Sequence, residues 1–195
     1  TAPDFTDVVN ANGLASATNV IVREGRVHIV ADNDVTVSGT IAAPGGVGVR
    51  GGDISIRAGG NVELNDGATV SARGNGENSA GGTIGSWAGN NAVLRSGAQM
   101  DASAGSTGDG GLVELSAKNR VTLEGGQMVA DAAHGAAGTV LIDPTVLTGS
   151  GFDLFSATNY VLTATDSITL NDVVIATRDV NSTDRNRTNI DSANS

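Results

Sequence analysis

A strand-like segment recurs five times in the middle of the chain at a nearly constant interval. Each copy begins with a β-branched residue, and apolar positions then alternate with polar ones, which is the pattern of a strand with one buried face. The copies occupy residues 27–31, 54–58, 84–88, 113–117 and 140–144, at intervals of 27, 30, 29 and 27 residues. Self-similarity at such a period predicts a stack of equivalent units.

Two further short strands follow the first strand within a unit. The second strand is expected at residues 35–37, 62–64, 92–94 and 121–123, and the third at 40–42, 68–72, 98–102 and 127–130. Between the first and second strands lie short segments with Asn, at residues 32–33, 60–61, 89–90 and 118–119. Gly and Asn tolerate a left-handed backbone, so these segments predict tight turns. Loops rich in Gly, Ser, Asn and Ala, such as 73–82 and 104–111, connect one unit to the next.

Three short strands, two tight turns and one longer loop make one coil of a β-solenoid. We therefore predict an all-β fold, a right-handed parallel β-helix with three short strands per coil, the hand following from the general rule for parallel crossovers. The inward columns are expected to be Val27/Ile54/Ile84/Val113/Val140, Ile29/Ile56/Ser86/Leu115/Ile142 and Ala31/Ala58/Ala88/Ala117/Pro144. An antiparallel sandwich also contains many short strands, but its hairpins do not require equivalent residues at a fixed period.

The composition agrees with a narrow aliphatic interior. The 195 residues include 28 Gly but only three Phe, one Trp and one Tyr, so Val, Ile, Leu and Ala have to form the core. The absence of Cys excludes a disulfide framework, a thiolate nucleophile and a Cys-ligated metal. Eleven Lys and Arg against 21 Asp and Glu give a net charge of −10, which disfavours nucleic acid as a partner.

The pattern divides the chain into four segments. They are an N-terminal entry or cap segment (1–23), regular coils (24–144), an irregular continuation of the β-helix (145–180) and a polar tail or linker (181–195). Residues 145–159 break the coil length and contain Phe152 and Phe155, which predicts a change of coil shape or a small excursion packed on the β-helix. The start of the sequence has no initiator Met and no signal-like pattern, and no apolar run is long enough to span a bilayer, so we expect a mature or excised fragment.

Five segments match motifs of a known family. They are 100–105 (MDASAG), 110–117 (GGLVELSA), 121–126 (VTLEGG), 131–144 (DAAHGAAGTVLIDP) and 159–170 (NYVLTATDSITL). The combination of a GG-x-V-E-x-S strand with a G-x-A-G-T-x-L-I-D-P turn resembles the filamentous-haemagglutinin-like exoproteins of two-partner secretion, which are large bacterial surface adhesins. The resemblance extends over residues 24–176.

This resemblance implies a right-handed β-helix that forms part of a long rod. The family implies export through an outer-membrane two-partner transporter, a secreted location at the Gram-negative cell surface, and a host or bacterial cell-surface receptor or glycan as the partner. The remainder of a larger parent polypeptide is then a further partner. The Asn-Pro motifs of the family's secretion domain are missing, because the three prolines follow Ala2, Ala43 and Asp143, so the resemblance indicates a stem fragment.

Three residues are candidates for binding or modification. If Ile84 and Ala88 face inward, Trp87 points outward and could stack on a sugar ring. A slip of one residue would turn Trp87 inward, and a third arrangement would cover it with the loops 73–82 or 103–111; a covered or structural Trp87 is the favoured reading. Asn181 and Asn186 begin N-x-S/T sequences and are candidate glycosylation sites, although such sequences also arise by chance in a tail rich in Asn, Ser and Thr.

An enzyme is the alternative to a structural protein, since carbohydrate lyases and hydrolases also use parallel β-helices. Glycoside hydrolysis requires two carboxyl groups flanking the scissile bond. The outward positions are expected to be His28, Ser55, Gly85, Glu114 and Leu141 on the first strands and Thr36, Glu63, Val93 and Thr122 on the second, without a stacked acidic pair. No catalytic residue, cofactor or metal site is therefore predicted. The two histidines, His28 and His134, lie far apart in the sequence, and the G-G-x-G-x-D calcium repeat does not occur.

Overall fold

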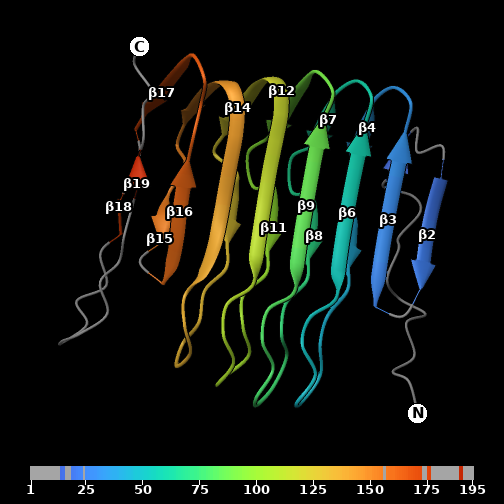
Figure 1. Cartoon of the computed structure of the whole chain (residues 1–195), viewed down its shortest axis with the longest axis vertical. Coiled ribbons are helices and arrows are strands. Elements are labelled where there is room, and N and C mark those ends of the chain that lie inside the picture. Colours follow the sequence, from blue (N-terminus) through green and yellow to red (C-terminus); the bar gives the residue numbers. More distant parts are fainter. Residues whose placement is uncertain are drawn as a thin grey trace.

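The computed structural model describes residues 14–15, 19–23, 25–155, 157–172, 175–176 and 189–190. They form an all-β fold without helices, a parallel β-solenoid of about five turns, which confirms the predicted class. Figure 1 shows the coils side by side, with the loops between coils projecting to one side. The described part therefore also has no helix long and apolar enough to cross a membrane.

Each of the first four coils contributes one strand to each of three columns, and the later coils continue only the first and second columns. The first column consists of β3 (Arg26–Ala31), β6 (Asp53–Ala58), β9 (Thr83–Ala88), the first halves of β12 (Leu112–Glu124) and β14 (Gly138–Ser150), and β16 (Thr158–Leu162). The second consists of β4 (Val35–Val37), β7 (Val62–Leu64), β10 (Asn91–Leu94), the second halves of β12 and β14, and β17 (Ser167–Asn171). The third consists of β5 (Thr40–Ala42), β8 (Thr69–Ser71), β11 (Gln99–Asp101) and β13 (Gln127–Val129).

The remaining short strands lie at the two ends of the columns. At the N-terminal end, β1 (Leu14–Ala15) and β2 (Asn19–Arg23) pair antiparallel with β4 and β3. At the other end, β15 (Leu154–Phe155) pairs with β18 (Ile175–Ala176), and β19 (Asn189–Ile190) pairs with β16, both in parallel. The first-coil strands β3 and β4 are thus covered by antiparallel pairing, whereas β5 ends its sheet and pairs with β8 on one side.

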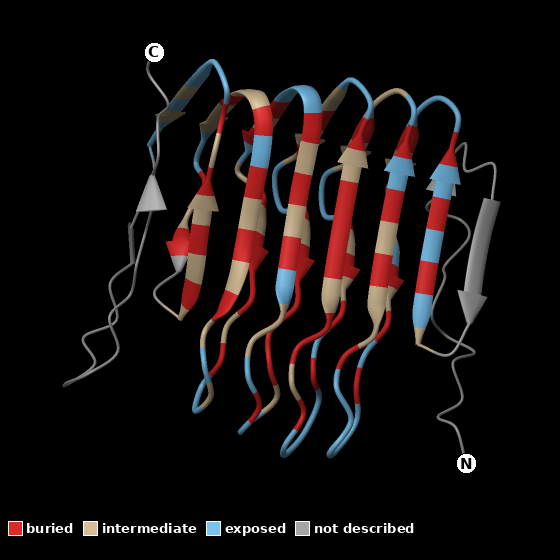
Figure 2. Cartoon of the chain, in the orientation of Figure 1, coloured by how far each residue is buried: buried red, intermediate tan, exposed pale blue. Residues whose placement is uncertain are grey.

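The predicted inward columns are confirmed residue by residue. Val27 is the register partner of Ile54, which pairs with Ile84, and the series continues through Val113 to Val140. All five side chains are at most 2% exposed. The bands of buried and exposed residues along the front strands in Figure 2 show the same alternation. Stacking β-branched residues in columns buries an aliphatic core without aromatic rings.

Two buried aromatic side chains lie where the coil length changes. Val140 is the register partner of Tyr160, so this coil has 20 residues, fewer than the 27–30 of the preceding coils. Phe152 and Tyr160 are both buried and pack edge to face, with ring centroids 6.0 Å apart. The Tyr160 hydroxyl donates a hydrogen bond of 2.8 Å to the carbonyl oxygen of Met128. Two rings therefore fill the interior beyond the third-strand column, which ends at β13.

The first corner differs from the predicted left-handed turn. In the described residues, none of the Asn residues at this corner has a positive φ. Their side chains instead bond from coil to coil: Asn61 Oδ1 accepts from Nδ2 of Asn90 and Asn91, and Asn91 Oδ1 accepts from Asn119 Nδ2. Positive φ values occur instead at the second corner, where Gly67, Gly97, Gly125 and Gly151 have values between 66° and 76°. The predicted turn at 118–119 is also absent, because β12 runs through this corner with a register shift between Ala117 and Arg120.

Glycine pairs, at 51–52, 81–82 and 110–111, close the base of three of the loops between coils. The Gly82 amide donates to the Ala72 carbonyl and the Gly111 amide to the Ala102 carbonyl, at 2.7 and 2.9 Å. A Cβ added to Gly81 would lie 1.8 Å from the Ala102 oxygen. Glycine is therefore required at these positions by the close approach of two backbone segments rather than by a left-handed conformation.

Candidate functional site

Trp87 lies on the outer face of the first column, between two strands that carry polar side chains. Its neighbours along β9, Ser86 and Ala88, are buried, whereas Trp87 is half-buried. The alternative in which a register slip turns Trp87 inward is therefore wrong. A Cβ built on Gly85 would lie 2.1–2.7 Å from atoms of the six-membered ring, so the indole covers Gly85. Gly85 is needed because any larger residue would displace the ring.

Two neighbouring coils hold the indole in this position. From β12, Glu114 Oε1 accepts hydrogen bonds from Trp87 Nε1 at 2.8 Å and from Ser116 Oγ at 2.9 Å. From β6, the Arg57 guanidinium carbon lies 4.4 Å from the ring centroid, which is a cation–π contact. We call Arg57, Gly85, Trp87, Glu114 and Ser116 the Trp87 cluster. Trp87 is thus half-buried by side chains of its neighbouring strands, including an arginine from the preceding coil.

A second outward cluster is centred on Arg95. The Arg95 Nε donates to Glu63 Oε1 at 2.5 Å, and Nη1 donates to Glu124 Oε2 at 2.9 Å. The hydrogen bond and charge of Glu63, followed by the charge of Glu124, raise the pKa of the Arg95 guanidinium above its usual value. Arg95 and Glu124 line a shallow groove of about 550 Å³ together with Asn65, Asp66 and Ser96. Both carboxylates are therefore bound to a permanent cation.

A neighbouring groove continues along the same face toward the C-terminal coils. It has a volume of about 570 Å³ and shares Glu124 with the first groove. Thr122, Thr148 and Thr169 occupy equivalent outward positions there, and Thr148 Oγ1 lies 3.4 Å from Thr122 Oγ1. The groove has neither an aromatic side chain nor a cation among its lining residues. Its hydroxyl groups can form hydrogen bonds, but they do not favour one class of ligand over another.

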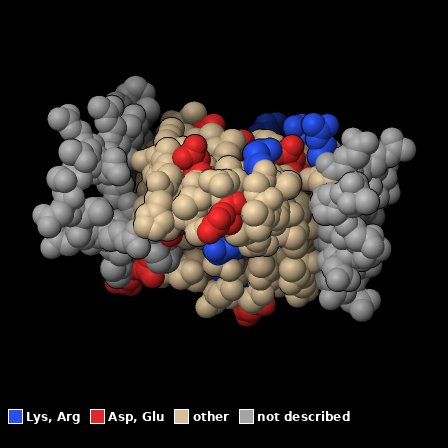
Figure 3. Space-filling view, turned by 90° about the horizontal axis from the view of Figure 1, so that it is seen from below, with Lys and Arg blue, Asp and Glu red and all other residues tan. Residues whose placement is uncertain are grey.

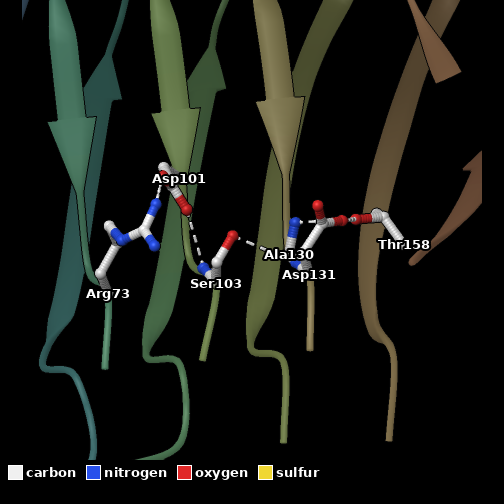
Figure 4. A network of polar contacts seen from close by, with 6 residues as sticks. All are labelled: Arg73, Asp101, Ser103, Ala130, Asp131 and Thr158. Carbon is white, nitrogen blue, oxygen red and sulfur yellow. Dashed lines mark hydrogen bonds and ion pairs between the residues drawn. The ribbon is translucent and has the colours of Figure 1, made fainter. Parts of the chain in front are cut away.

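A polar network runs across the corner where the third strands lead into the loops (Figure 4). Asp101 is only 3% exposed and accepts hydrogen bonds from Arg73 Nη1 at 2.6 Å and from the Ser103 amide at 2.8 Å. Ser103 Oγ accepts from the Asp131 amide at 3.1 Å, and the Asp131 carboxylate accepts from the Thr158 hydroxyl. Because its groups bond to one another from coil to coil, this network joins coils and satisfies a buried carboxylate.

The loops between coils form the face seen in Figure 3, where charged side chains of both signs are scattered among other residues. The loops are hydrogen-bonded to one another: the Gly48 amide donates to the Glu77 carbonyl, and the Gly105 amide donates to the Ser79 carbonyl. At one loop tip, Asn78 has a φ of 52° and its amide donates to Thr107 Oγ1. The stacked loops thus continue the coil-to-coil order of the strands.

The other predicted sites have simple outcomes. His28 and His134 are both exposed and lie in different coils, on β3 and in a loop. Within the described ranges, no three His, Asp or Glu side chains come together as metal ligands. Asn181 and Asn186 lie outside the described residues, so their glycosylation stays a prediction.

The sequence analysis missed the partners of Trp87 and Arg95. It listed Glu114 as an isolated outward residue, and it did not consider Arg57, Arg95 or Glu124 at all. A signal was available, since the repeat register places Arg57 and Ser116 directly beside Trp87. The outward columns expected from the sequence include Glu63 and Glu114 but omit the second outward position of the first strands, where Arg57, Trp87 and Ser116 form a column.

Comparisons of the chain with protein-family models, with curated proteins and with solved structures give no match. The structure itself defines the chain as a β-solenoid.

Proposed function

We propose that this chain is a structural segment of a secreted bacterial surface adhesin, forming part of an extended rod that presents binding regions to other cells. The observation that carries the proposal is the unbroken parallel register from β3 through β16. In such a stack each coil pairs mainly with its two neighbours, so the structure lengthens by adding coils without changing its cross-section. At about 4.8 Å per coil, five coils contribute about 24 Å of rod.

The order of the motifs in residues 100–170 supports the same assignment. Their resemblance to filamentous-haemagglutinin-like exoproteins suggests that an outer-membrane two-partner transporter exports the chain. It also suggests a location at the cell surface and a receptor or glycan on a host or bacterial cell. The acidic composition, with a net charge of −10, suits a rod that remains dispersed outside the cell and has no nucleic acid partner.

Export of the chain as part of a rod tests this proposal. Residues 1–195 are inserted between the secretion domain of a two-partner exoprotein and a C-terminal epitope tag, in cells with the matching transporter. We expect antibody to label the tag on intact cells as strongly as it labels the parent exoprotein. A tag that is present in lysates but inaccessible on intact cells contradicts the proposal, provided that a matched insert from a known stem is displayed.

A carbohydrate-active enzyme is the alternative, and one observation bears on it. Glu63 and Glu124 are outward carboxylates that approach a common point, as a catalytic pair does. Both are hydrogen-bonded to Arg95, so a cation of this chain occupies the point at which the two carboxylates meet. A screen for lyase and hydrolase activity on uronate polymers separates the two functions, since the structural proposal predicts no turnover.

A further inference from the structure

Arg57 is a cation that is held in place without being neutralised. Its guanidinium lies against the Trp87 ring, yet no hydrogen bond or ion pair joins it to another described residue. In contrast, a carboxylate oxygen lies within 4.0 Å of the guanidinium group in each of Arg26, Arg50, Arg73 and Arg95. The five N–H donors of Arg57 are therefore oriented by stacking and remain available to an anion.

Beside the N–H edge of the indole, Glu114 offers a hydrogen-bond acceptor. Both hydrogen bonds to Glu114, from Trp87 and from Ser116, end on Oε1. Oε2 of Glu114 accepts no hydrogen bond from the described residues. Since β6 and β12 are separated by β9 and Glu114 is two residues out of register with Arg57, the Arg57 and Glu114 positions lie about 12 Å apart, with the half-buried indole between them. A donor-rich cation, an apolar ring and an acceptor thus follow one another across three coils.

The strands beneath this row have no free edge. The strands β6, β9 and β12 are all paired on both sides, so their backbone offers no edge to an added peptide strand. Trp87 is only half-buried, so part of the indole between Arg57 and Glu114 remains exposed to solvent. A flat ligand with a carboxylate and hydroxyl groups matches this surface better than an extended peptide does.

We propose that the Trp87 cluster binds a carboxylated pyranose, such as a uronic acid within a polysaccharide. The sugar carboxylate accepts paired hydrogen bonds from Arg57, an apolar face of the ring lies against the indole, and a hydroxyl donates to Glu114 Oε2. This site is independent of the proposed export and rod function, because a rod without it still stacks and is still displayed.

The single tryptophan of the chain provides the measurement. The full chain is titrated with oligogalacturonate while the fluorescence of Trp87 is recorded, and the titration is repeated with the methyl ester of the same oligomer and with acetate. We expect a saturable change with oligogalacturonate alone. Loss of the charge-assisted hydrogen bonds in Arg57→Gln should weaken binding by about 10-fold or more. Arg120→Gln removes another exposed arginine from the neighbouring corner and should leave the affinity unchanged.

Each other result overturns the proposal. No saturable change with oligogalacturonate means that the cluster does not bind uronates. Equal titrations with the acid and its ester mean that the carboxylate is not recognised, and an equal response to acetate means that only an isolated anion is bound. Unchanged affinity in Arg57→Gln removes Arg57 from the site. Circular dichroism and thermal unfolding of this variant verify its folding, which we expect to be normal because Arg57 is exposed.

Discussion

Gly82 lies so close to the carbonyl oxygen of Gly52, one coil earlier, that a Cβ built on Gly82 would be 2.1 Å from this oxygen. The relationship repeats along the solenoid, because a Cβ built on Gly111 would be 2.0 Å from the oxygen of Gly82, and one built on Gly138 would be 2.3 Å from that of Gly111. A line of glycines therefore follows the base of the loops from coil to coil. It explains why pairs of glycines precede the first strands.

We expect Gly82→Ala to destabilise the fold by about 3 kcal/mol, because the methyl group would push two paired coils apart. Gly46→Ala is the matched control, since a Cβ at Gly46 meets no atom within 4 Å and its φ is not positive. This control should change the free energy of unfolding by less than about 0.5 kcal/mol. Urea denaturation of both variants checks the prediction, and equal stability of the two would contradict it.

Ser86 places a hydroxyl in an otherwise aliphatic column. It is 0% exposed and lies between Ile56 and Leu115. Among the buried side-chain nitrogen and oxygen atoms of the described residues, its Oγ has no hydrogen-bond partner. Ser86→Ala removes this unsatisfied group and should stabilise the fold by about 1 kcal/mol.

Ser103→Ala removes a hydroxyl group that, unlike that of Ser86, takes part in a hydrogen bond. The buried Ser103 Oγ accepts a hydrogen bond from the Asp131 amide, which would lose its partner. We expect this variant to be less stable by about 1 kcal/mol. Thermal unfolding of the two variants should therefore shift the midpoint in opposite directions, and a decrease for Ser86→Ala would show that its hydroxyl is satisfied.

Because adjacent residues of the first column face inward and outward, the same substitution at the two positions should change the free energy of unfolding by very different amounts. Ile56 is 0% exposed, so Ile56→Asp would bury a carboxylate among aliphatic side chains and cost about 4 kcal/mol or more. Ser55→Asp places the same group one residue earlier on the outer face, where about 0.5 kcal/mol is expected. Similar stability of the two variants, measured by urea denaturation, would contradict the assigned faces.

The sequence was sufficient for the columns but not for the contacts that cross them. The alternation and period of the five segments place Val27 beside Ile54 and Ile56 beside Ser86, because one face of each strand has to be buried. The break in coil length at residues 145–159 was predicted, but the coil of 20 residues that brings Tyr160 beside Val140 was not. It depends on how Phe152 and Tyr160 pack in the interior.

The roles of Gly and Asn in the turns also could not be predicted from the sequence. The same two residue types, Gly and Asn, are used for three purposes: vertical side-chain bonding at Asn61 and Asn91, positive φ at Gly67 and Gly97, and close backbone approach at Gly82. Composition cannot distinguish these roles because each depends on the neighbouring coil. The partners of Trp87 were missed for the same reason, since Arg57 and Glu114 belong to two other coils.

The central claim is that the coils stack in parallel and in register, and paired cysteines test it most directly because the chain has none of its own. His28 and Ser55 are register partners on the outer face, about 5 Å apart between strands, which is within disulfide range. His28 and Arg57 are two residues out of register and about 8 Å apart, beyond that range. Under mild oxidation, the account predicts that His28→Cys/Ser55→Cys forms an intramolecular disulfide and that His28→Cys/Arg57→Cys does not. Free thiols in the first variant, or equally rapid cross-linking in both, would contradict it.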